Sequence, residues 1–366
     1  MKNLNSMNKT SKNNFITYGI IVVLFLFCFA YTTAGMASYL FKGLLVPICV
    51  NVILAVSLNL TVGILGELSL GHAGFMCVGA FVGSFFSMMT QESLTSVWIR
   101  FPLAFIVGGL AAAFVGFLVG IPVLRLRGDY LAIVTLAFCE IIKNIMNNIY
   151  IAKDINGLHF AIGVGAYNEI QFDAASKQIL VNGAMGITGT PNDSNYFWGF
   201  ALILVTLVII LNLVNSRTGR AIMAIRDNRI AAESVGINIT KHKLIAFVIS
   251  AFFAGVAGVL YSHNLSSVVA TKFDYNYSIL VLVFVVLGGI GSMRGSVIAA
   301  IILTALPEFL RDIGNLSDYR MLIYAILLII MMLVNNNDQL QQTTQKWFGG
   351  LKLKKKAPKN QQEGVS

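Results

Sequence analysis

The chain has 366 residues, of which 57% are hydrophobic and only 11% are charged. Its mean hydropathy is +0.77 and its formal net charge is +10. Soluble domains carry about 25% charged residues, so this composition excludes an ordinary soluble protein and indicates a membrane protein. The basic residues lie at the ends of apolar runs and are not interleaved with aromatic residues on a soluble domain, which argues against a nucleic-acid-binding protein.

Apolar runs recur along most of the chain, and each transmembrane helix needs about 20 apolar residues. The runs predict about ten such helices, and thus an all-α polytopic membrane protein. Its transmembrane domain, residues 15–334, is expected between an N-terminal tail, 1–14, and a basic C-terminal tail, 335–366. The expected helices lie near residues 15–34, 44–62, 72–90, 101–124, 130–150, 197–214, 244–263, 277–293, 296–313 and 320–334.

The distribution of Lys and Arg predicts the orientation of these helices. With the N-terminus in the cytoplasm, 18 basic residues fall in cytoplasmic segments and 7 fall outside. Short loops rich in Lys and Arg stay in the cytoplasm, so both termini are expected there. The one long polar insert, residues 151–196, then lies outside and is expected to pack as an external cap.

A glycine-rich segment, Gly63–Gly74, interrupts the second and third predicted helices and contains Glu67, Ser69, Gly71 and His72. Non-helical backbone at membrane depth is tolerated only where it is buried in protein or faces water. In a functional interpretation, Ser69 and the amides after it cap the third helix, whose positive end faces an anionic group such as a substrate carboxylate. In a structural interpretation, the segment is a tight cytoplasmic turn with glycines for close packing, and its place near the inner interface slightly favours this.

The fifth predicted helix carries an acid and a base. Asp129 can cap this helix, and Glu140 and Lys143 lie three residues apart within it. Residues at this spacing share a helix face, so the two can form an ion pair. A charge at the bilayer centre costs about 2.5–3.5 kcal/mol on insertion scales, and this pair lies towards the outer end, where the cost is smaller. A structural pair and a role in a transport pathway remain equally open.

A charged segment, residues 215–243, separates the sixth and seventh predicted helices. Thr218 can cap a first short helix, and Asp227 or Asn228 can cap a second. Gly236 can end the second helix in a left-handed turn. A simple connecting loop does not need two helices with their own start and stop signals, so this arginine-rich segment is expected to dock on another protein.

The remaining motifs mainly limit the function. The stretch Leu287–Gly295 predicts a sharp hairpin, mainly structural, in which Gly289 and Gly291 could line the inner mouth of a pathway. The four cysteines lie inside apolar runs without a Cys-x-x-Cys pair, so they are expected to be buried core residues. No metal-ligand spacing predicts a metal site, and no Gly-x-x-x-x-Gly-Lys-Ser/Thr motif predicts ATP binding by this chain.

These segments, in this order, resemble the LivM-type permease of branched-chain amino acid ABC importers. The resemblance implies a permease subunit with a ten-helix importer fold in the bacterial cytoplasmic (inner) membrane, with no catalytic residues, metal or cofactor of its own. It covers roughly residues 40–334 and is carried by residues 66–75, 124–138, 219–228, 231–237 and 287–295.

The resemblance also implies partners. These are a LivH-like second permease, two LivG/LivF-like ATPase subunits that bind ATP and Mg²⁺, and an extracytoplasmic amino acid binding protein, all at a lipid bilayer and without nucleic acid. Residues 215–243 take the place of the loop that contacts the ATPase in such importers. The general importer signature begins with Glu-Ala-Ala, and here Ile230 stands where the acid is expected.

The resemblance assigns expected roles to individual residues. Ala221, Ile222 and Ile225 are expected to be buried in a groove on the ATPase, with Arg220 and Arg226 at the rim of that groove. The expected coupling residues are Arg220, Ala221, Ile222, Ile225, Arg226, Asp227, Ala231, Ala232, Glu233 and Gly236. The candidate pathway or gate residues are Glu67, Ser69, Gly71, His72, Glu140, Gly289 and Gly291.

Other functions remain open at this point. An ion-coupled secondary amino acid transporter would use Glu140 or Glu67 as its ion site, but it leaves residues 215–243 without a purpose. A membrane-embedded enzyme should show a convergent Ser/His/Asp or metal constellation, and none is visible in the sequence. Related permeases carry urea, short amides or other amino acids, whereas the segment Leu131–Phe138 favours branched-chain amino acids.

Overall fold

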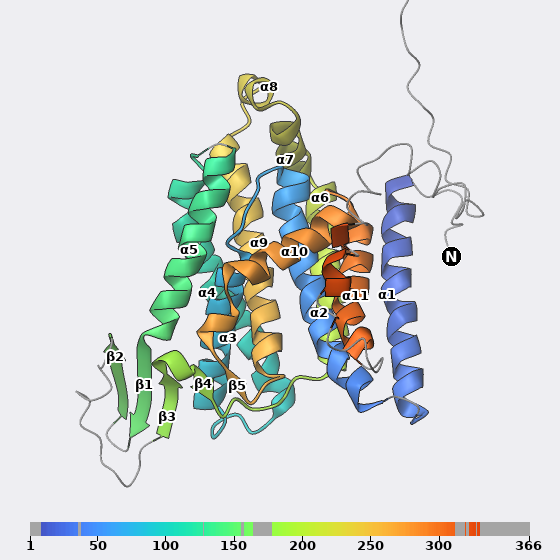
Figure 1. Ribbon diagram of the computed structural model, residues 1–366. Coiled ribbons are helices and arrows are strands. Elements are labelled where there is room, and N and C mark those ends of the chain that lie inside the picture. The colour runs from blue at the N-terminus through green and yellow to red at the C-terminus, as the bar shows by residue number, and fades with distance from the viewer. Residues whose placement is uncertain are drawn as a thin grey trace, which may run out of the picture.

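The structure is a computed structural model that describes residues 9–35, 38–126, 128–154, 157–163, 178–311, 319, 322–326 and 328–329. Over these residues the chain is mostly helical, and most of the long helices run roughly side by side (Figure 1). The helices are α1 (Lys9–Thr33), α2 (Tyr39–Asn59), the π-helical turn η2 (Leu60–Leu65), α3 (His72–Met89), α4 (Val97–Val123), α5 (Asp129–Asn147), α6 (Tyr196–Asn215), α7 (Arg217–Asp227), α8 (Arg229–Ser234), α9 (Ile239–Ser262), α10 (Tyr275–Gly288) and α11 (Met293–Arg311).

Seven helical segments of the described residues are long and apolar enough to cross a membrane, which confirms the predicted polytopic helical fold. They are α2 continued by η2, α3, α4, α6, α9, α10 with the short helix before it, and α11. Two further predicted spans coincide with α1 and with α5, a helix of 19 residues that is more polar because it carries Asp129, Glu140 and Lys143. The predicted span 320–334 lies mostly outside the described residues.

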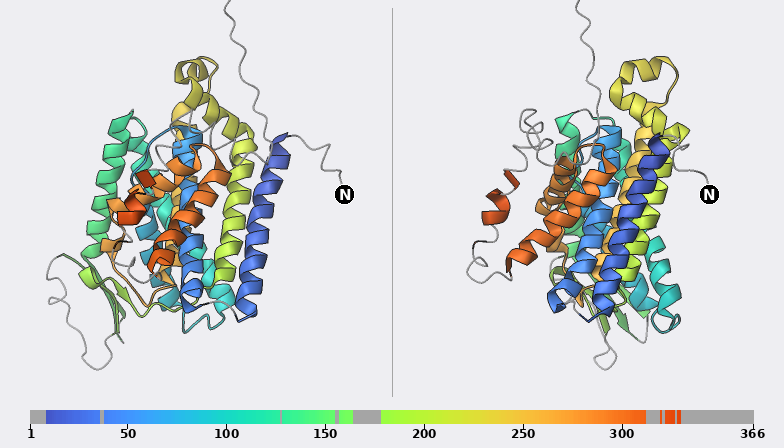
Figure 2. Two further views of the ribbon diagram at one scale, coloured as in Figure 1. Left: turned by 45° about the vertical axis from the view of Figure 1, so that its right-hand side comes forward. Right: turned by 90° about the vertical axis from the view of Figure 1, so that its right-hand side faces the viewer.

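The central helix is α2, which contacts α6, α9, α10 and α11. Every residue from Cys49 to Leu65 is buried, so α2 and η2 form the middle of the core. The helix α1 packs against α6 at one edge of the molecule (Figure 2). All four cysteines are buried and unpaired, as the sequence predicted.

Glycines bring the backbones of α3, α4 and α9 together. A Cβ atom at Gly79 of α3 would collide with the backbone of Gly255 on α9, and one at Gly255 would collide with Ala112 of α4. A Cβ atom at Gly108 of α4 would lie 2.8 Å from the Gly79 carbonyl oxygen. Small residues permit such close approach between membrane helices, where dispersion contacts rather than water exclusion drive association.

The insert between α5 and α6 forms a small sheet, which the all-α prediction did not include. Its antiparallel strands follow the order β2-β1-β3-β4-β5, and β5 comes from the turn after α9. The sheet lies at the end of the molecule opposite α7 and α8 (Figure 1). The strands are β1 (Ile149–Asp154), β2 (Gly157–Ile162), β3 (Gln178–Asn182), β4 (Ile187–Thr188) and β5 (Ser267–Val268).

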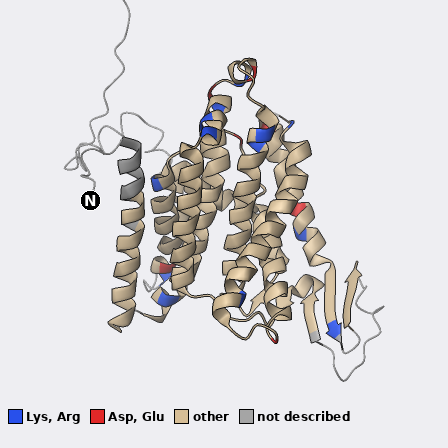
Figure 3. Ribbon diagram, turned by 180° about the vertical axis from the view of Figure 1, so that it is seen from behind, with Lys and Arg blue, Asp and Glu red and all other residues tan. Residues whose placement is uncertain are grey.

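Charged residues lie mostly near the two ends of the helix bundle (Figure 3). One acidic and one basic patch stand apart, part-way along α5 (Figure 3). The charges at the bundle ends fit the water-exposed flanks of membrane helices, whereas charge within a span calls for a specific explanation.

Candidate coupling and pathway site

The helices α7 and α8 between α6 and α9 each begin at a side-chain cap. The Ser216 hydroxyl accepts a hydrogen bond from the Gly219 amide at 3.2 Å, and the Asn228 side chain accepts one from the Ala231 amide at 3.1 Å. Asn228 is therefore one of the two predicted caps of the second helix. The predicted cap Thr218 is wrong: it lies inside α7, and Ser216 has the extended backbone that the capping position requires.

Gly236 follows α8 with a φ of +82°, as the sequence predicted. The Ile237 amide donates to the Ala232 carbonyl at 3.1 Å, and the Gly236 amide donates to the Glu233 carbonyl at 3.0 Å. These two bonds define a Schellman motif, which satisfies the last carbonyls of a helix. A side chain with a Cβ atom would strain the left-handed backbone at Gly236.

The apolar face of α7 is buried within this chain. Ile222 is 0% exposed, Ile225 is 4% exposed and Ala221 is half-buried, because α7 lies against α9 and η2. Their expected burial in a groove on an ATPase therefore does not fit this structure. The large apolar side chains that are exposed in the segment are instead Ile230, at 81%, and Val235, at 75%.

Of the other predicted coupling residues, one is buried and the rest are exposed to solvent. Ala232 is buried in a small cluster with Ile225 and Ile239. The exposed ones are Arg220, Arg226, Asp227, Ala231, Glu233 and Gly236.

Arg226 was predicted to lie at the rim of a groove on the ATPase, but its side chain extends from α7 towards the core of this chain. Its Nη1 donates to the Gly63 carbonyl oxygen of η2 at 2.7 Å, and its Nε lies 3.3 Å from the Asp227 carboxylate. A Cβ atom at Gly66, where φ is +80°, would lie 2.5 Å from Cγ of Arg226. Gly66 is therefore required both for its backbone conformation and for the passage of the Arg226 side chain.

The segment between η2 and α3 supports the structural interpretation. Gly71, rather than Ser69, occupies the N-cap position of α3, and the buried Ser69 hydroxyl has no hydrogen-bond partner among the described residues. The Leu70 amide donates to Thr135 Oγ1 at 3.0 Å, and the Ala73 amide donates to Ser278 Oγ at 3.0 Å. Neighbouring side chains therefore already use two of the amides that follow Ser69, and the proposed anion site at this helix end stays a prediction.

The two ionisable residues of this segment are both tied to other helices. Glu67 forms an ion pair with Lys243, a buried residue near the start of α9. His72 is 2% exposed, and its Nε2 lies 2.8 Å from the Ser57 hydroxyl of α2. These contacts tie the segment to α9 and the start of α3 to α2.

The hairpin between α10 and α11 packs on the same place. Gly289 and Gly291 have φ values of +92° and +83°, which a sharp turn requires. The Gly291 amide donates to Asn59 Oδ1 at 2.9 Å, and Asn59 Nδ2 donates to Ser296 at 3.0 Å. A Cβ atom at Gly63 would collide with both Asn59 and Gly291, so this glycine permits the close contact between η2 and the hairpin.

A cavity of about 220 Å³ lies between the charged segment and the residues that end and follow η2. Three cations and one carboxylate are among its lining residues, namely Arg226, Arg229, Lys243 and Glu67. The structure thus brings Arg226, Glu67 and Gly291 of the predicted site towards one end of the bundle. Glu140 lies apart from them on α5, where it pairs with Lys143.

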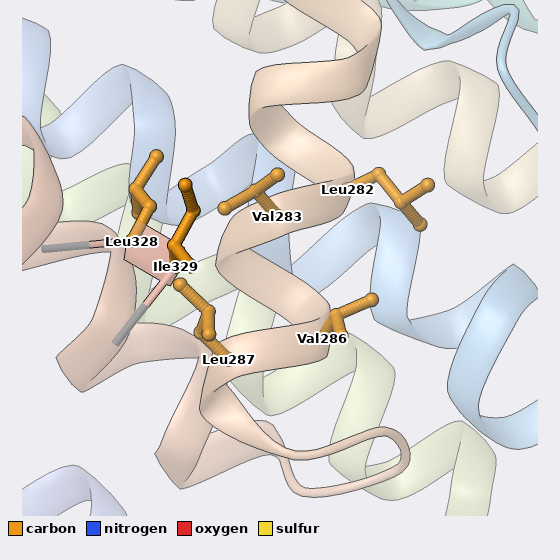
Figure 4. Close-up of a pocket in the computed structure, with 6 residues that line it drawn as sticks. All are labelled: Leu282, Val283, Val286, Leu287, Leu328 and Ile329. Atoms are coloured by element: carbon orange, nitrogen blue, oxygen red, sulfur yellow. The ribbon is translucent and has the colours of Figure 1, made fainter. Parts of the chain in front are cut away.

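A second groove, of about 250 Å³, is wholly aliphatic. Figure 4 shows its lining side chains, four from α10 and two from residues that follow α11. Without a polar group it suits a lipid chain or a packed helix better than a polar solute. The lining residues are Leu282, Val283, Val286, Leu287, Leu328 and Ile329.

Sequence reasoning missed several contact residues. Asn59 and Ser57 are polar residues within an apolar span, and that pattern was the available signal for a buried hydrogen-bonding role. In the sequence, Lys243 was considered only as one of the basic residues whose distribution predicts the orientation of the helices. Its pairing with Glu67 joins positions 176 residues apart, which no local pattern reveals.

Comparisons with known proteins agree with the resemblance. A family model described as branched-chain amino acid transport system / permease component matches residues 39–332. The LivM high-affinity branched-chain amino acid transport system permease proteins of Salmonella typhimurium and Escherichia coli are each 37% identical over 281 residues, or 75% of this chain. The match spans 64% of the length of each of these relatives.

A more distant relative is the ribose import permease protein RbsC of Escherichia coli, which is 30% identical over 168 residues. That match covers 41% of this chain and 52% of the relative. No solved structure matches the chain. The family match covers well over half of the residues and nearly all of the described helices. The chain therefore belongs to the family of branched-chain amino acid transport system permease components.

Proposed function

We propose that this chain and a second, LivH-like permease form the transmembrane pathway of an ATP-driven importer for leucine, isoleucine and valine. In this proposal, two LivG/LivF-like subunits bind ATP and Mg²⁺, and an extracytoplasmic binding protein delivers the amino acid. The chain resides in the bacterial inner membrane with both termini in the cytoplasm. The family match and the LivM relatives support this assignment over the sugar permeases, whose matches cover less of the chain.

The observation that carries ATP coupling is the exposed tip formed by Ile230 and Val235. Ile230 is the second residue of the short helix α8 and Val235 directly follows it, and α8 lies at one end of the molecule (Figure 1). Aliphatic side chains that are 81% and 75% exposed gain free energy when a partner covers them. The exposed Glu233 flanks this tip and can pair with a basic residue of the ATPase.

Arg226 supplies a route from the docking tip into the bundle. A displacement of α7 acts on the Gly63 carbonyl through the 2.7 Å hydrogen bond. Asn59, which directly precedes η2, accepts a hydrogen bond from the Gly291 amide and so links η2 to the hairpin. Single π-helical turns occur where a helix changes its hydrogen bonding, so η2 suits a position that switches between two arrangements.

The test is uptake by the complete complex in proteoliposomes. The wild-type complex should accumulate radiolabelled leucine only with ATP and the binding protein. The double variant Ile230→Asp/Val235→Asp should lower ATPase co-purification and uptake at least about tenfold, because two apolar contacts of roughly 1.5 kcal/mol or more are lost.

The control is Thr240→Asp, which adds one carboxylate at an exposed position of the same segment and should leave uptake unchanged. Uptake that survives ATP depletion and collapses with an ionophore would instead identify a secondary transporter.

A further inference from the structure

The cavity beside the charged segment is lined by a cation that has no partner among the described residues. Two of its three cations are already neutralised, because Arg226 lies beside the Asp227 carboxylate and Lys243 pairs with Glu67. The third, Arg229, makes no hydrogen bond or ion pair within the described part of the chain. A guanidinium group matches the geometry of a carboxylate or a phosphate, so this side of the cavity suits an anionic group.

The cavity also offers an acceptor for a donor group. Glu67 contacts Lys243 through its oxygen Oε1, and its other oxygen, Oε2, has no donor among the described residues. An ionised carboxylate can accept hydrogen bonds at both oxygens. Glu67 follows η2, whereas Arg229 belongs to α8, so the acceptor and the free cation come from two different elements.

The remaining lining makes the cavity suitable for a small, partly apolar solute. The buried side chains of Leu65 and Ile225 line it and provide aliphatic surface. Its volume of about 220 Å³ lies below the range of roughly 300–1,000 Å³ that is typical of pockets for drug-sized ligands. Gly66 and Arg226, which also line it, are exposed to solvent, so a small solute can reach it.

We propose that this cavity binds a zwitterionic aliphatic α-amino acid from the cytoplasm and that the bound amino acid inhibits import. The α-carboxylate accepts hydrogen bonds from Arg229, the α-ammonium group donates to Glu67 Oε2, and the aliphatic side chain covers Leu65 and Ile225. This inference rests on the proposed function and adds a regulation of its coupling site by the imported product.

The inhibition follows from where the two ends of the ligand bind. The cavity lies at the end of the bundle from which α7 and α8 project (Figure 1). A ligand held by both Arg229 and Glu67 joins the charged segment to the chain that follows η2. A ligand that binds only one of two arrangements shifts the protein towards that arrangement. The bound amino acid therefore opposes the displacement of the charged segment that coupling requires.

Other ligands and other cavities fit less well. A phosphate ion would pair with Arg229, but it would bring negative charge close to Glu67 and leave the aliphatic wall uncovered. The groove along α10 has no polar group (Figure 4). A cavity of about 390 Å³ beside Lys42 has no carboxylate among its lining residues and so lacks a charged partner for an ammonium group.

The first experiment measures import against leucine on the cytoplasmic side. Proteoliposomes contain the complete importer, with ATP and increasing unlabelled leucine in the lumen and with radiolabelled leucine and the binding protein outside. Luminal leucine should lower the initial uptake rate of the wild type several-fold. Arg229→Gln should import at the wild-type rate when the lumen contains no leucine, and it should need about tenfold or more luminal leucine for the same inhibition, because a charged hydrogen bond is lost.

A matched control removes a charge elsewhere in the same segment. Arg217 is an exposed arginine of α7 that does not line the cavity, so Arg217→Gln should remain as sensitive to luminal leucine as the wild type. Inhibition that persists unchanged in Arg229→Gln would place the inhibitory site elsewhere and overturn the inference.

Leucine analogues test the zwitterionic ligand. Luminal 4-methylpentanoate lacks the ammonium group and 3-methylbutylamine lacks the carboxylate, so neither should inhibit at concentrations at which leucine does. Inhibition by 4-methylpentanoate or by inorganic phosphate would identify a general anion site instead and contradict the proposal.

A second measurement does not depend on transport. In the complete complex without binding protein, leucine should slow amide hydrogen exchange in residues 63–67 and 226–237 of the wild type but not of Arg229→Gln. An unchanged exchange pattern would count against the site. Full uptake that luminal leucine does not reduce refutes this inference alone, whereas a wild-type complex that imports no leucine into an empty lumen refutes the proposed function.

Discussion

His263 shows what a single buried side chain can contribute at the end of α9. It is 0% exposed, its Nδ1 lies 2.9 Å from the Val259 carbonyl oxygen, and its ring packs against Phe101. Burial lowers the pKa of His263 to about 4, against an opposing contribution from the Val259 carbonyl. Asp193 raises this pKa and Arg100 lowers it, and these two residues form an ion pair nearby.

The low pKa predicts a loss of stability in acid. An unfolded histidine takes up a proton near pH 6.5, whereas folded His263 resists protonation until about pH 4. The unfolded state thus binds more protons in this window, and stability falls as the pH decreases through it, by roughly 2–3 kcal/mol. Thermal melting in detergent at several pH values should show this decrease. His263→Asn should flatten it, and the control His242→Asn, at a half-buried position, should not.

At the residue level, the sequence predicted features that depend on neighbours along the chain. Gly236 and Asn228 were predictable because a helix end needs a left-handed residue and a cap needs a side-chain acceptor. The Glu67–Lys243 pair was not, because it depends on how two distant helices pack. Nothing in the sequence indicated that Ile222 and Ile225 are buried against distant elements of this chain, so they appeared available to a partner protein.

At the level of the elements, Arg226 makes the hydrogen bond between α7 and η2. Arg226→Gln shortens the side chain and removes its charge, so the 2.7 Å bond to the Gly63 carbonyl is lost. Because the docking tip is unchanged, the ATPase should still bind, but leucine uptake per ATP hydrolysed should fall several-fold. Parallel measurements of uptake and ATPase activity in proteoliposomes check this.

Arg229→Gln is the control for that experiment. Arg229 lines the same cavity, and among the described residues it makes no hydrogen bond or ion pair. An equal loss of coupling in both variants would show that cavity charge matters rather than the Arg226 hydrogen bond.

The elements also show why the helices were easier to predict than the sheet. A long apolar run in a membrane protein almost always forms a helix, because a helix makes hydrogen bonds to its own backbone N–H and C=O groups where no water is present. The strands β4 and β5 have two residues each and pair across almost 80 positions. Such short strands carry no periodicity of their own, so the insert was predicted only as a cap.

At the scale of the whole molecule, the proposed orientation places α8 in the cytoplasm and the sheet outside. Val235→Cys and Ile162→Cys test it, because both native side chains are 75% exposed at opposite ends. A membrane-impermeant maleimide added to intact spheroplasts should label only Ile162→Cys. The native cysteines are buried and should contribute little background. Labelling of Val235→Cys in intact spheroplasts would place α8 beyond the reach of a cytoplasmic ATPase.

The glycine contacts among α3, α4 and α9 limit how such a molecule can open. With no side chain between Gly79 and Gly255, these backbones interlock, and sliding one past another would force them into steric overlap. The three helices are thus expected to move as one rigid body. In the proposed importer, the opening and closing movements are then expected in elements outside this body, such as η2, to which Arg226 is hydrogen-bonded.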